Sequence, residues 1–311
     1  FLSKEITSFG LWIEQLIAES TGKEGKGLIP VVDEPSGRPE DYGDDRVFVS
    51  ICIREEEKHL KKTLKSLIDA GHPVLSFRMK DVYELGGEFL RWEVATAVAG
   101  QILGINPFDQ PDVELAKKLT RARLRAIEKG MISPPGVEVG DKKFKIYFGE
   151  STYNLIRKAS AKDGDAKKAL REFMGLIKKG DYVGVLAYFD PEDRAVGESL
   201  KDLRKTLRDS TGAATQLGYG PRYLHSTGQL HKGGANKGLF LILCHETKED
   251  IKIPKSSFSF SELELSQAFG DMEALDARGC RVALVNIKDP SIETLKEAEG
   301  LIKSAVESAG K

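Results

Sequence analysis

The stretch VFVSICIREEEKHLKKTLKSLIDAGHPVLSF, residues 47–77, decides the fold class. It begins with an apolar run at 47–53 that has no polar alternation, as expected of a strand covered on both faces. The charged, amphipathic stretch 54–71 then predicts a helix that ends at Gly71. A second short strand is predicted at 73–77. A strand, a helix and a strand in this order predict a parallel βαβ unit.

The same alternation extends outward from this unit. A further covered strand is expected at LIPVV, residues 28–32, and a long helix from about Tyr83 to Leu103. Pro107 cannot extend that helix, and a new one is predicted over 111–130 with its proline in the first turn. Residues 131–164 differ, because Pro and Gly punctuate them around a predicted hairpin, VEVGDKKFKIYFG.

The second half returns to alternating helices and strands. Its predicted elements are a helix at 165–179, strands at 182–189, 238–244 and 280–287, and helices at 193–210, 260–278 and 290–308. We therefore predict an α/β fold with doubly wound, mainly parallel sheets in three layers and two halves. We expect one domain over 1–130, a linker or insertion with a hairpin over 131–164, and a second α/β domain over 165–311.

Composition excludes several classes of protein. The chain has 311 residues, 40% of them hydrophobic and 31% charged, and a formal net charge of −1, so no global field attracts nucleic acid or an anionic membrane. No apolar run is long enough for a membrane span and no signal peptide is evident, so we expect a cytoplasmic protein. The cysteines Cys52, Cys244 and Cys280 lie in apolar runs without metal-ligand spacing; we expect buried thiols and no metal.

A first candidate site is QLIAESTGKEGKG, residues 15–27. Gln15 and Glu19 are four residues apart, so they share one face of a helix near its C-terminus, where Gly22 turns the chain. A carboxylate at the negative end of the helix dipole would have a raised pKa, which suits a general base. The alternative is that Glu19 is a solvated residue of the last turn and Gly22 an ordinary cap.

A second candidate is NPFDQPDVELAKK, residues 106–118. Gln110 and Lys117 are seven apart and would point the same way on one helix, which places an amide and a cation where they could recognise hydroxyl groups. The alternative is a proline-capped helix on which Lys117 is a surface charge.

A third candidate is GYGPRYLHSTGQLHKGG, residues 218–234, which we expect to be a long loop between strands. Loops of this length are usually functional. Either His225 or His231 could be an acid–base group, because the ordinary pKa of histidine lies near neutrality. The alternative is a solvent-facing loop histidine.

Together these segments resemble the phosphoglucose isomerase family, which is built from sugar-isomerase (SIS) domains with doubly wound parallel sheets. GQILGINPFDQPDVELAK (100–117) resembles the most specific signature of the family, although Asp112 stands where the family has a small residue. EQLIAESTGKEGKG (14–27) is similar to the segment that ends a helix with the catalytic glutamate. YLHSTGQLHKGG (223–234) resembles the bacterial segment that carries the catalytic histidine.

The resemblance implies isomerisation of glucose 6-phosphate to fructose 6-phosphate through a cis-enediol, with no cofactor and no metal. It implies that Glu19 moves the proton between C2 and C1, that His225 opens the pyranose ring, and that Lys117 assists at the ring oxygen or the C1 hydroxyl. Gln15 and Gln110 fall on positions that contact the sugar. The histidine would act within its own subunit or across a homodimer interface.

The order of the segments departs from most of the family, in which the histidine segment comes before the FDQ signature. With its GYGPR prefix, that segment looks most like the fused transaldolase/glucose-6-phosphate isomerase proteins. We therefore expect a C-terminal part of such a fusion, with the phosphate loop and further domains upstream of Phe1, and at most trace activity alone. Two other functions stay open: a non-catalytic SIS module that binds a sugar phosphate, and a Schiff-base lysine enzyme.

Overall fold

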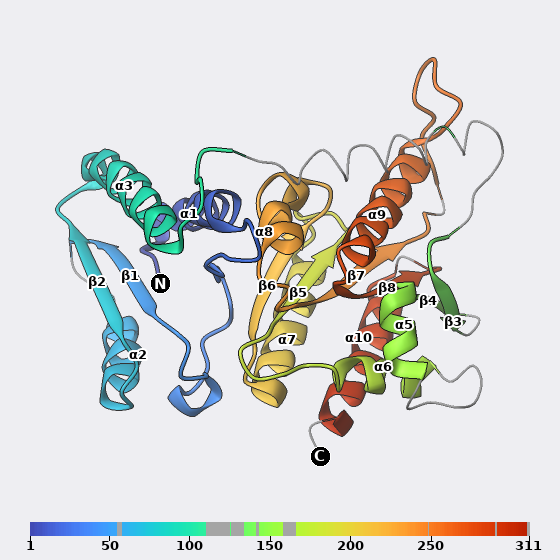
Figure 1. The fold of residues 1–311 in the computed structure, drawn as a ribbon, viewed down its shortest axis with the longest axis horizontal. Helices are drawn as coiled ribbons and strands as arrows, with labels where there is room; N and C mark the ends of the chain where they lie inside the picture. Colours follow the sequence, from blue (N-terminus) through green and yellow to red (C-terminus); the bar gives the residue numbers. More distant parts are fainter. Residues whose placement is uncertain are drawn as a thin grey trace.

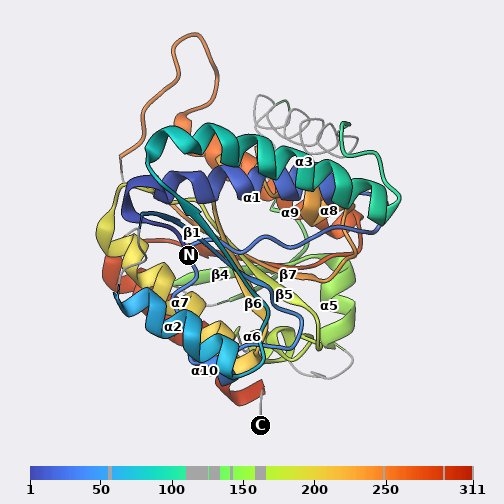
Figure 2. The same ribbon diagram turned by 90° about the vertical axis from the view of Figure 1, so that its left-hand side faces the viewer.

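The computed structural model describes residues 1–54, 58–109, 125, 134–140, 143–157, 166–247, 249–289 and 291–309 (Figure 1). They form a two-stranded sheet of order β1-β2 and a six-stranded sheet of order β3-β4-β8-β7-β5-β6. Helices cover both faces of these sheets, so the chain has three layers when viewed from the side (Figure 2). The predicted α/β class is confirmed.

The smaller sheet contains the βαβ unit that the sequence predicts. Strands β1 (Phe48–Ile53) and β2 (Val74–Met79) are parallel and are joined through helix α2 (Lys58–Asp69). Helices α1 (Thr7–Thr21) and α3 (Leu85–Leu103) lie on one face of the sheet and α2 lies on the other (Figure 2). Short 3-10 helices are η1 (Lys4–Ile6), η2 (Pro39–Asp41) and η3 (Val82–Glu84).

The prediction of a strand at 28–32 is wrong. This segment has no regular structure, and side chains bind its backbone in place of a neighbouring strand. Gln216 Nε2 donates to the Pro30 carbonyl oxygen at 2.6 Å, and Arg204 Nη2 donates to the Val32 carbonyl oxygen at 3.0 Å. These side chains occupy carbonyl oxygens that a neighbouring strand would need, and Pro30 has no N–H group for a β-ladder, so the apolar run does not become a strand.

The larger sheet has a parallel core. Strand β5 (Tyr182–Ala187) lies between β6 (Ala214–Tyr219) and β7 (Gly238–His245), and β7 pairs with β8 (Arg281–Ile287). Every residue of β5 is buried, as the apolar run predicts for a strand covered on both faces.

Each face of this sheet has its own hydrophobic core. Helices α6 (Ala166–Met174), α7 (Arg194–Thr211) and α10 (Ile292–Ala309) pack on one face. Helices α8 (Gly228–Gly233) and α9 (Phe260–Ala277) lie on the other face, in the layer that also holds α1 (Figures 1 and 2).

The segment that we expected to be a linker or insertion contributes to the larger sheet. Its hairpin is confirmed as antiparallel strands β3 (Val137–Gly140) and β4 (Phe144–Phe148), and β4 pairs with β8. Helix α5 (Glu150–Arg157), which we did not predict, follows the hairpin. The helix predicted at 111–130 lies outside the described residues, apart from the helical Arg125. The division into domains stays a prediction.

A buried carboxyl group lies where α1 faces the larger sheet. Glu14 is 6% exposed, and burial raises its pKa to about 7, although the positive charges of Arg204 and Arg222 oppose the rise. The protonated form is therefore favoured by folding.

Replacing Glu14 with Gln should stabilise the protein in a pH-dependent way. The folded pKa is above the unfolded one, so the wild type loses stability as the pH rises from about 4.5 through 7, whereas Gln cannot ionise. Urea unfolding should show a gain of roughly 2–3 kcal/mol at pH 8 and less than about 1 kcal/mol at pH 5. The exposed Glu5→Gln variant is the control and should change little at either pH. An equal gain at both pH values for Glu14→Gln would show that folding does not raise the pKa of the Glu14 carboxyl.

Candidate functional site

The first candidate pair has the geometry that its spacing predicts. Gln15 and Glu19 lie on the last turns of α1, and Gln15 Nε2 donates to Glu19 Oε2 at 3.2 Å. Gln15 is exposed and Glu19 is half-buried. The amide therefore orients a carboxylate that remains open to a ligand.

The turn after α1 is packed directly against α8. At Gly22, a side-chain Cβ would lie 2.3 Å from the Cα of Leu230, so only glycine permits this approach. Gln229 Nε2 donates to the Gly22 carbonyl oxygen at 2.9 Å, and the Gly25 N–H donates to the Gly233 carbonyl oxygen at 2.9 Å. The glutamate segment and the histidine segment, about 200 residues apart in the chain, thus share one interface.

The histidine segment is folded, contrary to our expectation of a long loop. Residues 218–234 contain the end of β6, the 3-10 helix η4 (Arg222–His225) and α8. The short elements were missed because glycines and a proline break their periodicity.

The two histidines of this segment have different environments. His225 is exposed at the end of η4, whereas His231 is 2% exposed and its Nε2 lies 3.1 Å from Gln216 Oε1. Burial lowers the pKa of His231 well below its usual value, so its imidazole is neutral. Of the two, His225 is the one that a ligand in solvent can reach.

The FDQ segment, the second candidate, meets the same turn through lysines. The buried Lys23 donates from Nζ to the Asn106 carbonyl oxygen at 2.8 Å and pairs with Asp109 Oδ1 at 3.1 Å. Lys26 Nζ donates to the Leu103 carbonyl oxygen at 2.8 Å. The start of the FDQ segment is therefore fixed to the turn at 22–27. Gln110 and Lys117 lie outside the described residues.

Sequence reasoning missed the residues that join the segments. Lys23 and Gln229 are buried and make contacts between distant parts of the chain. A lysine between glycines in GKEGKG could have indicated a buried cation, but glycine richness alone predicts only a turn.

Neither a metal-ion site nor a membrane-spanning helix is found among the described residues. No group of at least three His, Cys, Asp or Glu side chains there could hold a metal ion. Among the helices that the structure describes, none combines the length and apolar character needed to cross a membrane.

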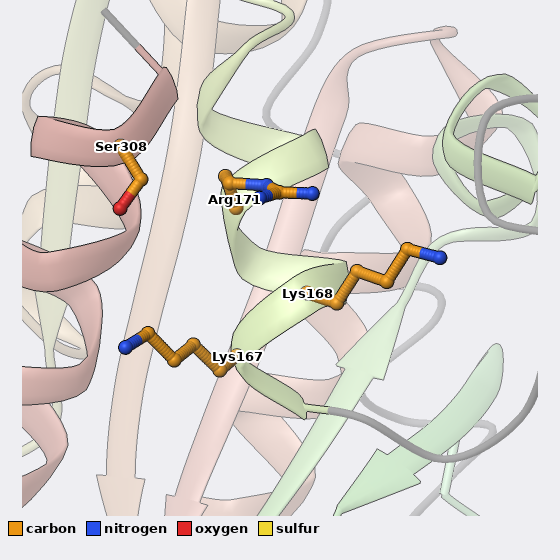
Figure 3. A pocket seen from close by; sticks show the side chains of 4 residues that line it. All are labelled: Lys167, Lys168, Arg171 and Ser308. Atoms are coloured by element: carbon orange, nitrogen blue, oxygen red, sulfur yellow. The ribbon is translucent and has the colours of Figure 1, made fainter. Parts of the chain in front are cut away.

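A separate basic hollow lies between α6 and α10, on the opposite side of the larger sheet from α8 (Figures 1 and 3). Lys167, Lys168, Arg171 and Ser308 line it. The Ser308 hydroxyl donates to the Ser304 carbonyl oxygen. Because the sheet separates this hollow from the turn at 22–27, it is not part of the candidate site.

The fold and the three joined segments define an α/β protein with one candidate site, at the end of α1 and beside α8. No protein-family profile matches the chain. It is 30% identical to the glucose-6-phosphate isomerase of Rubrobacter xylanophilus over 150 residues, 36% of this chain and 35% of that protein. It is 28% identical to the probable glucose-6-phosphate isomerase of Methanococcus maripaludis over 148 residues, 37% of this chain and 34% of that protein.

A third such relative is the glucose-6-phosphate isomerase of Acetivibrio thermocellus, 29% identical over 174 residues, 44% of this chain and 37% of that protein. The chain thus spans about a third of the length of the curated relatives it matches. Over this part it is related to the glucose-6-phosphate isomerases. A hypothetical protein from Thermus thermophilus is similar in structure with a TM-score of 0.39 and 13% identity, over 99% of this chain and 77% of that one; so low a score supports no inference.

The close approach of Gly22 to α8 can be tested by adding one methyl group. Gly22→Ala should lower stability by about 1–3 kcal/mol, because the backbone of Leu230 cannot move without disturbing α8. Gly300→Ala is the matched control, since that glycine lies in α10 with open space around its Cβ direction; it should raise stability by up to about 1 kcal/mol. Denaturant unfolding of both variants measures the difference. A Gly22→Ala variant as stable as Gly300→Ala would contradict the packing described.

Proposed function

We propose that this chain carries part of the active site of a glucose-6-phosphate isomerase and takes part in the conversion of glucose 6-phosphate to fructose 6-phosphate. The observation that carries the proposal is the turn at 22–27, which contacts both α8 and the start of the FDQ segment. The named relatives support the same reaction.

In this proposal Glu19 is the base. Its carboxylate takes the proton from C2 of the open-chain aldose, the C1–C2 double bond of a cis-enediol forms, and the proton returns to C1. The hydroxyl proton of O2 passes to O1, so the net reaction moves hydrogen without an external oxidant. The hydrogen bond from Gln15 to Glu19 Oε2 orients the carboxylate and leaves Oε1 to accept the proton.

His225 would act in the preceding step, the opening of the pyranose ring. Ring opening removes the proton of the C1 hydroxyl, breaks the bond from C1 to the ring oxygen, and gives that oxygen a proton. An exposed imidazole at the end of η4 can carry one of these protons. We assign Lys117 to assistance at the ring oxygen or C1 hydroxyl, and Gln15 and Gln110 to contacts with the sugar.

We further propose that other parts of the site come from beyond these residues. By analogy with the family, the phosphate-binding groups and the positive charge that stabilises the enediolate would lie upstream of the glutamate helix. Those groups would come from upstream domains of a transaldolase fusion, and His225 would act within its subunit or across a homodimer. We therefore expect only trace turnover by the chain alone, since bound phosphate normally orients the reacting carbons.

Exchange of solvent deuterium into the sugar tests the base. In D2O, the chain should introduce deuterium at C2 of recovered glucose 6-phosphate and at C1 of fructose 6-phosphate, faster than buffer or heat-denatured protein does. Glu19→Gln should lower this rate by about 10²-fold or more, because the amide cannot accept the proton. The control Glu93→Gln changes an exposed carboxylate on α3 and should exchange at the wild-type rate.

Nuclear magnetic resonance of the sugar measures both positions. Exchange that equals the wild-type rate in Glu19→Gln would refute the base assignment. Binding of glucose 6-phosphate without any exchange by the wild type would refute the isomerase and favour a binding module.

A further inference from the structure

A buried charged cluster lies beneath the histidine segment. Lys232 Nζ pairs with Asp271 Oδ1 at 2.6 Å, and the exposed fractions of the two side chains are 2% and 0%. The hydroxyl of Tyr223 donates to the other carboxylate oxygen, Asp271 Oδ2, at 2.6 Å. Asp271 comes from α9, whereas both of its partners come from the histidine segment.

The protonation state of this cluster is well defined. Burial and the negative charge of Asp271 raise the pKa of Tyr223 well above its usual value, so the phenol keeps its proton and donates it. The hydroxyl of Tyr188 lies 3.4 Å from that of Tyr223, and it is Tyr223 that donates to the carboxylate. Tyr188 thus touches the cluster at its margin.

Stability alone is a poor reason for such a cluster. Burying two charges costs desolvation free energy that their attraction repays only with good geometry, and apolar replacements of buried ion pairs are often as stable. A buried cluster of this kind does fix orientation, because the hydrogen bond from Tyr223 is short and directional and the Lys232 ammonium must stay beside the carboxylate, whereas apolar contacts permit sliding.

The network holds the chain on both sides of His225. Tyr223 comes two residues before His225 and Lys232 comes seven after it. Within this span, the Ser226 N–H donates to the Tyr223 carbonyl oxygen at 3.0 Å and the His231 N–H donates to the Thr227 carbonyl oxygen at 3.0 Å. One carboxylate therefore anchors η4 and α8 together to α9, and α8 also supports the turn that follows Glu19.

We propose that Asp271 is a positioning residue, which through Tyr223 and Lys232 sets the place of the His225 imidazole for opening the sugar ring. This inference rests on the proposed function. Asp271 itself is fully buried and touches no substrate. Tyr223, which Asp271 binds directly, lies two residues before His225, whereas the turn after Glu19 meets α8 through Gln229, Leu230 and Gly233, so proton transfer at C2 by Glu19 should depend on Asp271 much less.

Two single variants separate this role from general packing. Tyr223→Phe removes the hydroxyl that binds Asp271 and leaves the ion pair in place. Tyr188→Phe is the matched control, because it removes a neighbouring buried hydroxyl without that bond. The double variant Asp271→Leu/Lys232→Met tests the carboxylate, since it replaces both charges with apolar groups of similar size and should still fold.

Two substrates separate the two chemical steps. Glucose 6-phosphate must open its ring, whereas a four-carbon aldose 4-phosphate has no free hydroxyl that closes a five- or six-membered ring. Tyr223→Phe and the double variant should lower deuterium exchange into glucose 6-phosphate about tenfold and exchange at C2 of the four-carbon sugar less than about twofold. Tyr188→Phe should stay within about twofold on both. An equal loss on both substrates, or no loss in Tyr223→Phe, would overturn the proposal.

A second measurement does not depend on enzymatic activity. Amide hydrogen exchange of the full chain should be at least about tenfold faster at Ser226 and His231 in Tyr223→Phe and in the double variant than in Tyr188→Phe, with β5 and β7 unchanged. Wild-type protein that exchanges neither sugar would refute the proposed function, while this comparison would still decide whether Asp271 positions the segment. Unchanged protection at Ser226 in both variants would overturn the positioning role.

Discussion

The contact between Gly22 and Leu230 is the constraint on which the candidate site depends. The absence of a side chain lets the end of α1 lie against the backbone of α8, and this joins the segment that carries Glu19 to the segment that carries His225. The larger sheet supports this contact, because α8 lies on the face of its parallel strands (Figure 2). A wider gap would break the hydrogen bond from Gln229 to the Gly22 carbonyl oxygen. Leaving buried polar groups unpaired costs free energy of folding.

Sequence patterns predicted the parts of the fold that follow from local rules. Continuous apolar runs became the covered strands β1, β5, β7 and β8, and the charged helices between them were found within a few residues. The apolar run at 28–32 did not become a strand, because the buried side chains of Arg204 and Gln216 bind its backbone. No local pattern in the sequence shows such distant partners. The hairpin was predicted, but its pairing with β8 depends on tertiary structure.

The candidate site likewise has parts that the sequence predicts and parts that it does not. The pairing of Gln15 with Glu19 follows from helical spacing and could be predicted from the residues alone. That the histidine segment approaches them was expected only from the family resemblance. The contacts that bring it there, from Lys23, Gln229 and Asp271, join positions tens to hundreds of residues apart, and a lysine or an aspartate in a sequence looks like surface charge until its partner is known.

The size of α8 explains why buried polar groups are needed at this place. It has six residues with glycine at both ends, and a helix so short has no stability of its own. Its position must come from its neighbours: the Gly22 turn on one side, Asp271 on another, and Cys280, whose thiol contacts the His231 carbonyl oxygen. The position of the exposed His225 imidazole, just before α8 in the chain, therefore depends on these contacts. Apolar packing would bury the helix equally well, but a hydrogen bond and an ion pair to one carboxylate select a single register, and the acid–base role proposed for His225 requires that selection.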